Sequence, residues 1–438
     1  MQFSSTLQQS PLVSWEDAIL QGLPPDNGLY MPTEIPVLPA TFWARVQEMS
    51  FIEIAYEVSL AWLGDVIPAN VLKDLMMAAY DFEDQVVNLD DDLAILELFH
   101  GPSMAFKDFG ARFMAQVMTY FLDQRDTNLH ILVATSGDTG GAVAKGFFGS
   151  KRVKVTILYP KGKVSDIQEK QLTTLGGNIA ALEISGTFDD CQAMVKKAFL
   201  DQELRDLIPL ASANSINMAR LLPQAFYYIS AYGKLKKIGK PLVFVVPSGN
   251  FGNLSAGILA EKMGMPVEGW VAATNANNVV PSYLHSGNFT PIQPSIPTIS
   301  NAMDVGNPSN FPRLQALFNG NLQAMRSRIH GWGFSDEQTR EAMQVIYQKY
   351  NYVVCPHTAV GWLGWKAYQE ATQSNALGVV LATAHYAKFL PEVEPTLQTQ
   401  VAIPERLAQL LSLPKVADAM EPDYNLLKIW LLSTANRH

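Results

Sequence analysis

A single lysine, Lys107, stands in an apolar stretch of the chain that reads GPSMAFKDFGARF. Lysine is usually solvated, and burying its charge without a partner is costly. Lys107 comes just before a helical pattern whose apolar stripe begins with Phe109 and Phe113. Burial among aromatic rings and the positive end of a helix both lower the pKa of an amine, which favours a lysine that forms a Schiff base. Taken alone, however, the segment is more typical of a surface lysine at a helix start.

A glycine-containing loop, PSGNFGN at residues 247–253, could bind a phosphate. It lies between an expected strand and an expected helix, so its backbone amides and the helix dipole can converge on one anion. The loop has neither the Walker ending nor the dinucleotide spacing. A plain strand-to-helix turn with Asn253 near the cap explains it equally well.

A second loop, TSGDTGG at residues 135–141, has a similar design. Ser136 and Thr139 offer hydroxyl groups, and the amides at the expected helix start attract a carboxylate or a phosphate. Asp138 is equally suited to capping that helix. A reactive amine, a phosphate-binding loop and a second anion-binding turn are together the parts that pyridoxal phosphate and an amino-acid substrate require.

The remaining requirement is a partner for the pyridine nitrogen of that cofactor. TAHYAKF places Thr383 at the end of an expected strand, where its neutral hydroxyl could take this role. Without the other segments, a strand-end threonine that bonds to backbone is the commoner explanation. The assignment therefore depends on the whole set of motifs.

The segments that must position these residues alternate between short apolar runs and helical patterns. HILVATSGDTGGAVAKGFF and PLVFVVPSGNFGNLSAGILAEKMG each indicate a strand, a loop and a helix. Continuous apolar strands between helices are typical of an α/β fold with parallel sheets. We expect three parts: a mostly helical N-terminal region at 1–95, an α/β domain with Lys107 and the substrate loops at 96–240, and an α/β domain with the phosphate loop and Thr383 at 241–438.

Composition limits the class of protein and its partners. The chain has 438 residues, 48% of them hydrophobic and 17% charged, which indicates a globular protein of two or three domains. Cys191 and Cys355 are far apart and lack metal-ligand spacing, so we expect no disulfide framework and no metal. No basic residue precedes Arg45 and no apolar run reaches ~20 residues, so we expect a cytoplasmic protein without a signal peptide or membrane span. The net charge of −9 argues against nucleic acid as a partner.

The ordered set of motifs resembles the threonine synthase family in its bacterial and fungal form. The segments that carry the resemblance follow in the family's order: PDNGLYMP, HGPSMAFKDFGARFMA, ATSGDTGGAVA, KGKVSDIQEKQLTT, GTFDDCQAMVKKAF, SANSINMARLLPQ, VPSGNFGNLSAG, NAMDVGNPSNFPR and TAHYAKF. The resemblance implies a pyridoxal-phosphate enzyme of fold type II, with two parallel-sheet domains like those of the tryptophan synthase β chain. Ser103 and Met104 differ from many relatives conservatively, and Tyr386 stands where many have proline.

The resemblance also implies roles for particular residues. Lys107 would hold the cofactor covalently and move the protons, and Thr383 would face the pyridine nitrogen. The cofactor phosphate would lie at Gly249, Asn250, Phe251, Gly252 and Asn253. The candidate substrate-binding residues are Ser136, Thr139, Lys163, Ser165, Asn217 and Arg220. For Lys163, a surface salt bridge is an equally good explanation.

The reaction that the resemblance implies is the conversion of O-phospho-L-homoserine and water to L-threonine and phosphate, the last step of threonine biosynthesis. Such an enzyme is a carbon–oxygen lyase acting on phosphate, and we expect a monomer or a homodimer. Two alternatives remain open. One is a phospholyase of the same family that releases a keto acid, and the other is a pyridoxal-phosphate-binding protein without catalytic activity.

Overall fold

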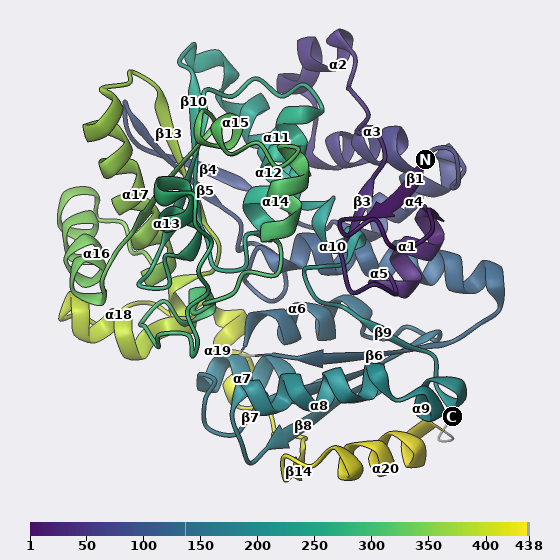
Figure 1. The fold of residues 1–438 in the computed structure, drawn as a ribbon. Coiled ribbons are helices and arrows are strands. Elements are labelled where there is room, and N and C mark those ends of the chain that lie inside the picture. The colour runs from purple at the N-terminus through teal and green to yellow at the C-terminus, as the bar shows by residue number, and fades with distance from the viewer. Residues whose placement is uncertain (136, 436–438) are drawn as a thin grey trace.

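The computed structural model describes residues 1–135 and 137–435. Within them, six strands form the larger sheet, in the spatial order β12-β11-β10-β13-β5-β4 (Figure 1). Neighbouring strands are parallel, except that β4 runs antiparallel to β5. The strands are β4 (Gln85–Asp90), β5 (Leu93–Glu97), β10 (Leu242–Pro247), β11 (Gly269–Thr274), β12 (Ile329–Gly333) and β13 (Leu377–Ala382).

A second, fully parallel sheet of the described residues has the order β14-β8-β7-β6-β9 and lies below the first in Figure 1. Most of its strands are buried on both faces, which explains their continuous apolar sequence. The strands are β6 (Leu129–Ala134), β7 (Val153–Pro160), β8 (Ile179–Ile184), β9 (Leu210–Ser212) and β14 (Asp418–Met420). The expected α/β fold with parallel sheets is confirmed.

The N-terminal region is mostly helical, as the sequence predicted, and also contains a small antiparallel sheet in the order β2-β1-β3. Its strands are β1 (Gln2–Ser5), β2 (Val13–Ser14) and β3 (Tyr30–Pro32). Its helices are α1 (Trp15–Gln21), α2 (Ala40–Arg45), η1 (Val46–Glu48), α3 (Phe51–Leu63) and α4 (Ala69–Ala79). α3 begins at a capping box formed by Ser50 and Glu53, which satisfies amides that the helix cannot pair internally.

Helices cover both faces of each large sheet. Alternate side chains of β10 point to opposite sides: Val243 and Val245 pack with α16 and α17, whereas Phe244 and Val246 join the core that lies towards the second sheet. The helices after α4 are α5 (Lys107–Arg125), α6 (Asp138–Phe147), α7 (Asp166–Thr173), α8 (Phe188–Leu200), α9 (Gln202–Leu207), α10 (Met218–Leu221), α11 (Gln224–Leu235), η2 (Lys236–Ile238), α12 (Gly252–Lys262), α13 (Val279–Ser286), η3 (Asn301–Met303), α14 (Phe311–Leu317), α15 (Leu322–Arg326), α16 (Asp336–Tyr350), α17 (Pro356–Thr372), η4 (Tyr386–Phe389), α18 (Leu390–Leu397), α19 (Glu405–Leu411) and α20 (Tyr424–Ala435).

The largest core lies between the two sheets and is centred on α5. Phe109, Phe113 and Val117 on this helix are fully buried, so the apolar stripe expected after Lys107 faces the core. Within the described residues, no helix is both long and apolar enough to span a membrane.

Two segments pack on a different domain from the one to which the sequence analysis assigned them. β4 and β5, which lie mostly before residue 96, complete the larger sheet beside β13. β14 and α20, at the end of the chain, pack on the smaller sheet, as the yellow helix at the bottom of Figure 1 shows. We still propose a helical N-terminal region and two α/β domains. In this division, β4 and β5 belong to the domain of the larger sheet, and β14 and α20 belong to the domain of the smaller sheet.

Candidate active site

Lys107 is the first residue of α5 and lies beside the segment that follows β13. The Phe106 amide donates to the Thr383 carbonyl oxygen at 2.8 Å, and the His385 amide donates to the Met104 carbonyl oxygen at 3.2 Å. These two hydrogen bonds hold the backbone just before Lys107 next to the backbone around Thr383, so the two residues expected at the cofactor lie on adjacent segments. Met104 adopts a left-handed backbone conformation, with φ +55°, which is uncommon for a residue other than glycine and often marks a functional segment.

The Lys107 amine has the lowered basicity that the sequence predicted. Burial lowers its pKa to about 8, against the nearby charge of Asp138, which raises it. Lys388 and Arg220 repel the ammonium form and lower the pKa further. The neutral amine is therefore a minor species near physiological pH but far more populated than in an ordinary lysine, which suits a nucleophile or a general base.

The glycine loop lies at the carboxyl end of β10, where ligands bind in open α/β sheets. Phe251 has φ +60°, and α12 begins without a side-chain cap from the described residues. Gly249 is packed so closely on η3 that a Cβ there would lie 2.7 Å from the Met303 Cα. A Cβ on Gly252 would lie 3.2 Å from Asn310 Nδ2. The uncapped start of α12 and the absence of side chains at Gly249 and Gly252 allow a phosphate to approach the backbone closely.

Asn253 supplies the clearest sign that this loop fits a phosphate. Its Oδ1 accepts hydrogen bonds from the hydroxyls of Tyr227, at 2.5 Å, and Tyr228, at 2.7 Å. Its Nδ2 is buried and has no hydrogen-bond partner among the described residues. Buried donors are rarely left unpaired, and the two tyrosines fix the orientation of the amide. An anion at the loop would satisfy this donor, so the residues present fit the phosphate of pyridoxal phosphate.

The second loop is organised by a residue that the sequence analysis did not single out. Thr135 Oγ1 accepts from the amides of Gly137 and Gly140, both at 3.0 Å. Asp138 does not cap α6; the cap residue is Gly137, at φ +144°, and this interpretation of Asp138 was wrong. Thr139 lies in the first turn of α6 and is partly buried. Ser136 lies outside the described residues.

Two further candidates, Lys163 and Ser165, lie between β7 and α7. Lys163 is exposed, and none of the ion pairs found among the described residues involves it. Ser165 is the N-cap of α7, where its Oγ accepts from the Gln168 amide at 3.3 Å. This bond uses the hydroxyl oxygen as an acceptor and leaves the hydroxyl hydrogen for another partner.

Asn217 and Arg220 are both buried at the start of α10. The Asn217 side chain is used within the protein, because Oδ1 accepts from the Ala219 amide and Nδ2 donates to the Ile19 carbonyl oxygen. Arg220 donates from one terminal nitrogen to the Ala213 carbonyl oxygen at 2.6 Å, while its Nε has no partner among the described residues. Burial lowers the pKa of Arg220 to about 10, although the Asp108 carboxylate opposes this.

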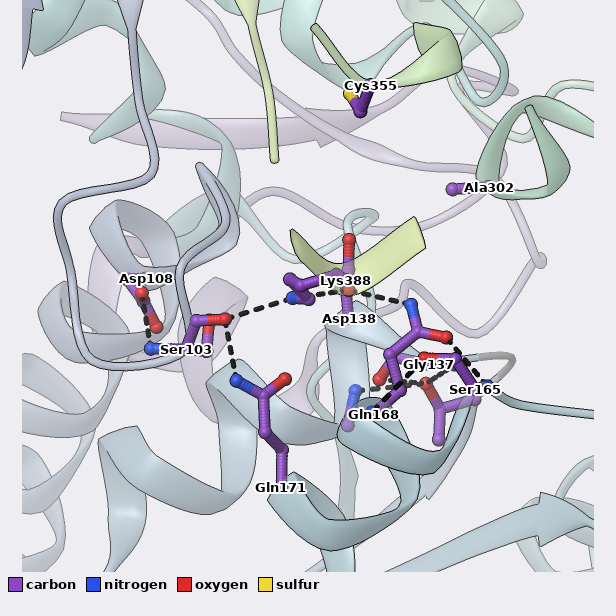
Figure 2. A network of polar contacts seen from close by, with 12 residues as sticks. Ser103, Asp108, Gly137, Asp138, Ser165, Gln168, Gln171, Ala302, Cys355 and Lys388 are labelled. Atoms are coloured by element: carbon purple, nitrogen blue, oxygen red, sulfur yellow. Dashed lines mark hydrogen bonds and ion pairs between the residues drawn. The ribbon is translucent and has the colours of Figure 1, made fainter. Parts of the chain in front are cut away.

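The sequence analysis did not identify a buried polar network around Asp138 and Lys388 (Figure 2). Lys388 forms an ion pair with Asp138, with 2.5 Å between Nζ and Oδ1, and donates to the Ser103 carbonyl oxygen at 2.9 Å. Burial alone would raise the pKa of Asp138, but Lys388 and Lys107 hold it well below its ordinary value. Lys388 belongs to TAHYAKF, so the only signal in the sequence was a lysine in the same short segment as Thr383.

His357 faces the same cluster from the start of α17. Its Nε2 accepts from the Ala302 amide at 3.3 Å, and its Nδ1 faces Cys355 Sγ at 3.8 Å. Burial lowers the pKa of His357 to about 4, so the imidazole is neutral at physiological pH. Among the described residues around Lys107, Asp138 is therefore the carboxylate whose pKa is lowered, and His357 is uncharged.

These features define a class of protein, the pyridoxal-phosphate-dependent enzymes of fold type II. The sequence profile described as pyridoxal-phosphate dependent enzyme matches residues 88–383, which include Lys107, the glycine loop and Thr383. The profile of the threonine synthase N terminus matches residues 2–80, and that of the threonine synthase C-terminal region matches residues 358–430. The chain belongs to the threonine synthase family, and its cofactor is pyridoxal phosphate.

Characterised relatives agree over nearly the whole length. The threonine synthase of Serratia marcescens is 42% identical over 421 residues, covering 96% of each chain. The crystal structure of threonine synthase from Escherichia coli superposes with a TM-score of 0.91 at 40% identity and covers 99% of this chain and 100% of its own. The pyridoxal-phosphate-bound threonine synthase from Brucella melitensis gives a TM-score of 0.94 at 33% identity, with full coverage of both chains at 100%.

Proposed function

We propose that this enzyme converts O-phospho-L-homoserine and water into L-threonine and phosphate. The observation that carries the proposal is the buried guanidinium of Arg220, whose Nε has no partner among the residues that the structure describes and which acts electrostatically on Lys107. A substrate with its own phosphate needs a cation near the reactive amine but separate from the cofactor's phosphate loop. Arg220 satisfies this requirement, because a guanidinium is well suited to phosphate.

For the cofactor, we assign Lys107 as the residue that binds it covalently and Thr383 as the partner of the pyridine nitrogen. The phosphate is assigned to the loop residues Gly249, Asn250, Phe251, Gly252 and Asn253. Bound pyridoxal phosphate supplies the electron sink that acidifies the substrate's C–H bonds. Thr383 offers a neutral hydroxyl, which does not stabilise a protonated pyridine nitrogen as a carboxylate would.

Lys107 has the properties of the acid–base residue. When its amine is not bonded to the cofactor, Lys107 would be free to accept and return protons. With a pKa near 8 in this site, Lys107 is poised for both directions of transfer at neutral pH. We therefore assign the proton transfers at the substrate's carbon atoms to Lys107.

For the substrate, we assign the phosphate to Arg220, which would bind it and stabilise the charge that develops as it leaves. Asn217 uses both polar atoms within the protein, so we assign it the positioning of α10 and hence of Arg220. We keep Ser136, Thr139, Lys163 and Ser165 as substrate-binding candidates; of the described ones, Thr139 lies in the first turn of α6, and Lys163 and Ser165 lie between β7 and α7.

The test is the reaction of the purified enzyme with O-phospho-L-homoserine, with products quantified by amino-acid analysis and phosphate assay. We expect threonine and phosphate in equal amounts. Phosphate accompanied by 2-oxobutyrate would instead assign the chain to a phospholyase. No phosphate release from a protein that carries the cofactor would indicate a silent binding protein.

We also propose that the protein acts in the cytoplasm as a monomer or a homodimer. Fractionation of cells and light scattering of the purified protein test the two statements separately.

A further inference from the structure

Two lysines, Lys107 and Lys388, lie near one carboxylate, that of Asp138. The Lys388 side chain is 0% exposed and that of Asp138 is 5% exposed. Burying charged groups is tolerated only when they are paired and hydrogen-bonded. The pairing between Lys388 and Asp138 meets this condition, and it leaves Lys107 without a direct ion pair among the described residues.

Lys388 joins three segments of the chain (Figure 2). It lies on η4, directly after β13 of the larger sheet, whereas Asp138 opens α6 after β6 of the smaller sheet. The third contact is the carbonyl oxygen of Ser103, in the loop that leads to Lys107. A single ammonium group therefore connects both large sheets and the loop that positions the reactive amine.

α7 supplies a second donor to each acceptor that Lys388 binds. Gln168 Nε2 donates to Asp138 Oδ1 at 2.9 Å, and Gln171 Nε2 donates to the Ser103 carbonyl oxygen at 2.9 Å. The Gln168 side chain is itself held by the capping box with Ser165. Lys388 and Gln168 both donate to the Asp138 carboxylate, one from η4 and one from α7. The position of this carboxylate is therefore determined by the fold and not by Lys107.

Asp138 and Lys107 interact electrostatically. The charge of Asp138 raises the pKa of Lys107, while Lys107 contributes to lowering the pKa of Asp138. If Lys388 were absent, Lys107 would be the remaining lysine whose charge is found to act on this buried carboxylate. An ion pair between them would hold Lys107 protonated and withdraw the lone pair that the cofactor requires.

We propose that Lys388 is a positioning residue of the active site, whose ammonium binds Asp138 and Ser103 and thereby prevents Asp138 from pairing with Lys107. This inference rests on the proposed role of Lys107 as the amine that binds the cofactor. Lys388 acts through Asp138 and has no role of its own in the bond-making steps.

Other charged or titratable groups also face this cluster and must be kept constant in a test. Arg220 on α10 lowers the pKa of Lys107, and His357 on α17 responds to Asp138 and both lysines. Asp108 on α5 and Cys355 before α17 also respond to the cluster's charges. Each of these groups is unchanged in the variants below, so differences among them report on the pair formed by Lys388 and Asp138.

The experiment compares wild type with Lys388→Met, Asp138→Asn and the double variant. The full-length chain is stripped of cofactor and labelled with trace acetic anhydride from pH 6 to pH 10, and the reactivity of Lys107 is measured by peptide mass spectrometry. Reconstitution with pyridoxal phosphate, followed by its visible absorption at each pH, is the second readout. The matched control is Lys234→Met, which removes a lysine paired with the buried Asp84 at 3.2 Å, away from this cluster.

We expect Lys388→Met to move the midpoint of Lys107 reactivity upward by about one pH unit or more, because Asp138 then pairs with Lys107 and the repulsion between the two lysines is lost. The double variant lacks the competing carboxylate and is expected to return the midpoint to the wild-type value or below. Lys234→Met is expected to leave it unchanged. A purely structural role for Lys388 would impair the double variant at least as much as the single one, so the restoration is specific to the proposal.

An unchanged midpoint in Lys388→Met, or no restoration in the double variant, would overturn the inference. If Lys388→Met does not fold, Asp138→Asn alone decides, because removing the carboxylate must lower the midpoint of Lys107 while Lys388 is intact. Wild-type Lys107 that does not capture pyridoxal phosphate would contradict the proposed function itself. Normal capture in wild type with no response in any variant would contradict only the role of Lys388.

Discussion

Asn250 Nδ2 donates a hydrogen bond to Ser215 Oγ at 2.9 Å, which joins the loop assigned to the cofactor phosphate to the loop that leads to Arg220. Asn250 Oδ1 accepts from the Ser309 amide at 2.6 Å, so a third loop is tied to the same side chain. The sites proposed for the two phosphates are therefore parts of one hydrogen-bonded unit. Displacement of one loop should disturb the other.

Arg313 lies behind this unit and offers a way to test the coupling. Its guanidinium is fully buried and donates to Asn310 Oδ1 at 2.6 Å, to the Ser215 and Tyr30 carbonyl oxygens at 3.3 Å each, and to the Ile216 carbonyl oxygen. Burial lowers its pKa to about 9. We expect Arg313→Met to destabilise the protein by about 2–3 kcal/mol and to weaken both pyridoxal phosphate and substrate binding, because it leaves buried acceptors unpaired.

The measurements for Arg313→Met are the melting temperature, the dissociation constant of pyridoxal phosphate and the KM for phosphohomoserine. Arg326→Met is the control, since Arg326 also binds backbone carbonyls, those of Leu284 and His285, but away from the glycine loop. A lower melting temperature with both affinities unchanged would show that Arg313 stabilises the fold without organising the site.

Lys107→Ala is expected to lower turnover by several orders of magnitude, because one residue has both the covalent and the acid–base role. In wild type, we expect visible absorption from the bound cofactor and, after borohydride reduction, a cofactor label on the peptide that contains Lys107. Lys163→Ala, which changes an exposed lysine, should retain the absorption and the label. A label on another lysine would contradict the assignment.

Gly252→Val is expected to weaken pyridoxal-phosphate binding by roughly tenfold or more, equivalent to about 1.4 kcal/mol. The added side chain would stand where backbone must approach the phosphate, and even a Cβ would lie 3.2 Å from Asn310 Nδ2. The measurement is a cofactor titration of the stripped enzyme. Gly269→Ala is the control, because a Cβ there makes only ordinary contacts at 3.7 Å. An unchanged affinity in Gly252→Val would move the phosphate to another loop.

The parts of the site that could be predicted from the sequence were those with a local signal. The apolar run of β10 followed by a glycine loop, and the stripe that begins with Phe109, identify their own elements because the pattern lies within one segment. Lys107 and Thr383 were connected by the requirements of pyridoxal phosphate and by the family resemblance, because no pattern within one segment links them. Their adjacency depends on backbone bonds between segments that are distant in the chain.

The parts that could not be predicted depend on contacts between distant segments. Asp138 is a favoured residue for a helix cap, but Gln168 and Lys388 take its carboxylate, so the local preference does not decide its role. Likewise, β5 joins β13 and β14 joins β8, and no local pattern specifies which strands become neighbours in a parallel sheet. Nothing in TAHYAKF alone shows that its lysine is buried.

Arg220→Ala is expected to lower kcat/KM for phosphohomoserine by roughly a hundredfold, equivalent to about 2–3 kcal/mol for a lost charged contact. Arg220→Lys should also be impaired, because it keeps the charge but loses the planar fork. The cofactor spectrum confirms that each variant still binds pyridoxal phosphate. Arg112→Ala is the control, as Arg112 pairs with Asp81 at the surface at 2.9 Å. Near-normal kinetics in both Arg220 variants would move the substrate phosphate elsewhere, with Lys163 the next candidate.

Asp108, the residue after Lys107, should make the stability of the protein depend on pH. It is fully buried, and burial raises its pKa from 3.8 to about 6, although hydrogen bonds from Ser103 and the charge of Lys388 oppose this. Between pH 3.8 and about pH 6, the folded state binds more protons at Asp108 than the unfolded state does. The contribution of Asp108 to the free energy of unfolding therefore falls as the pH rises through this range. At pH 7, ionisation of the buried Asp108 lowers the free energy of unfolding by roughly 3 kcal/mol at most.

Asp108→Asn removes the titration and keeps an oxygen that can accept from the Ser103 amide, now bonded to Asp108 Oδ2 at 2.8 Å. We therefore expect the variant to gain stability relative to wild type as pH rises from 4 to 6, with no further gain above pH 7. The measurement is the difference in melting temperature between the two proteins across this range. Asp65→Asn, at a side chain that is 86% exposed, should show a smaller trend. If the difference in melting temperature between wild type and Asp108→Asn were the same at every pH, Asp108 would be ionised throughout this range. A buried cation would then stabilise its carboxylate more strongly than the contacts with Ser103 and Lys388 indicate.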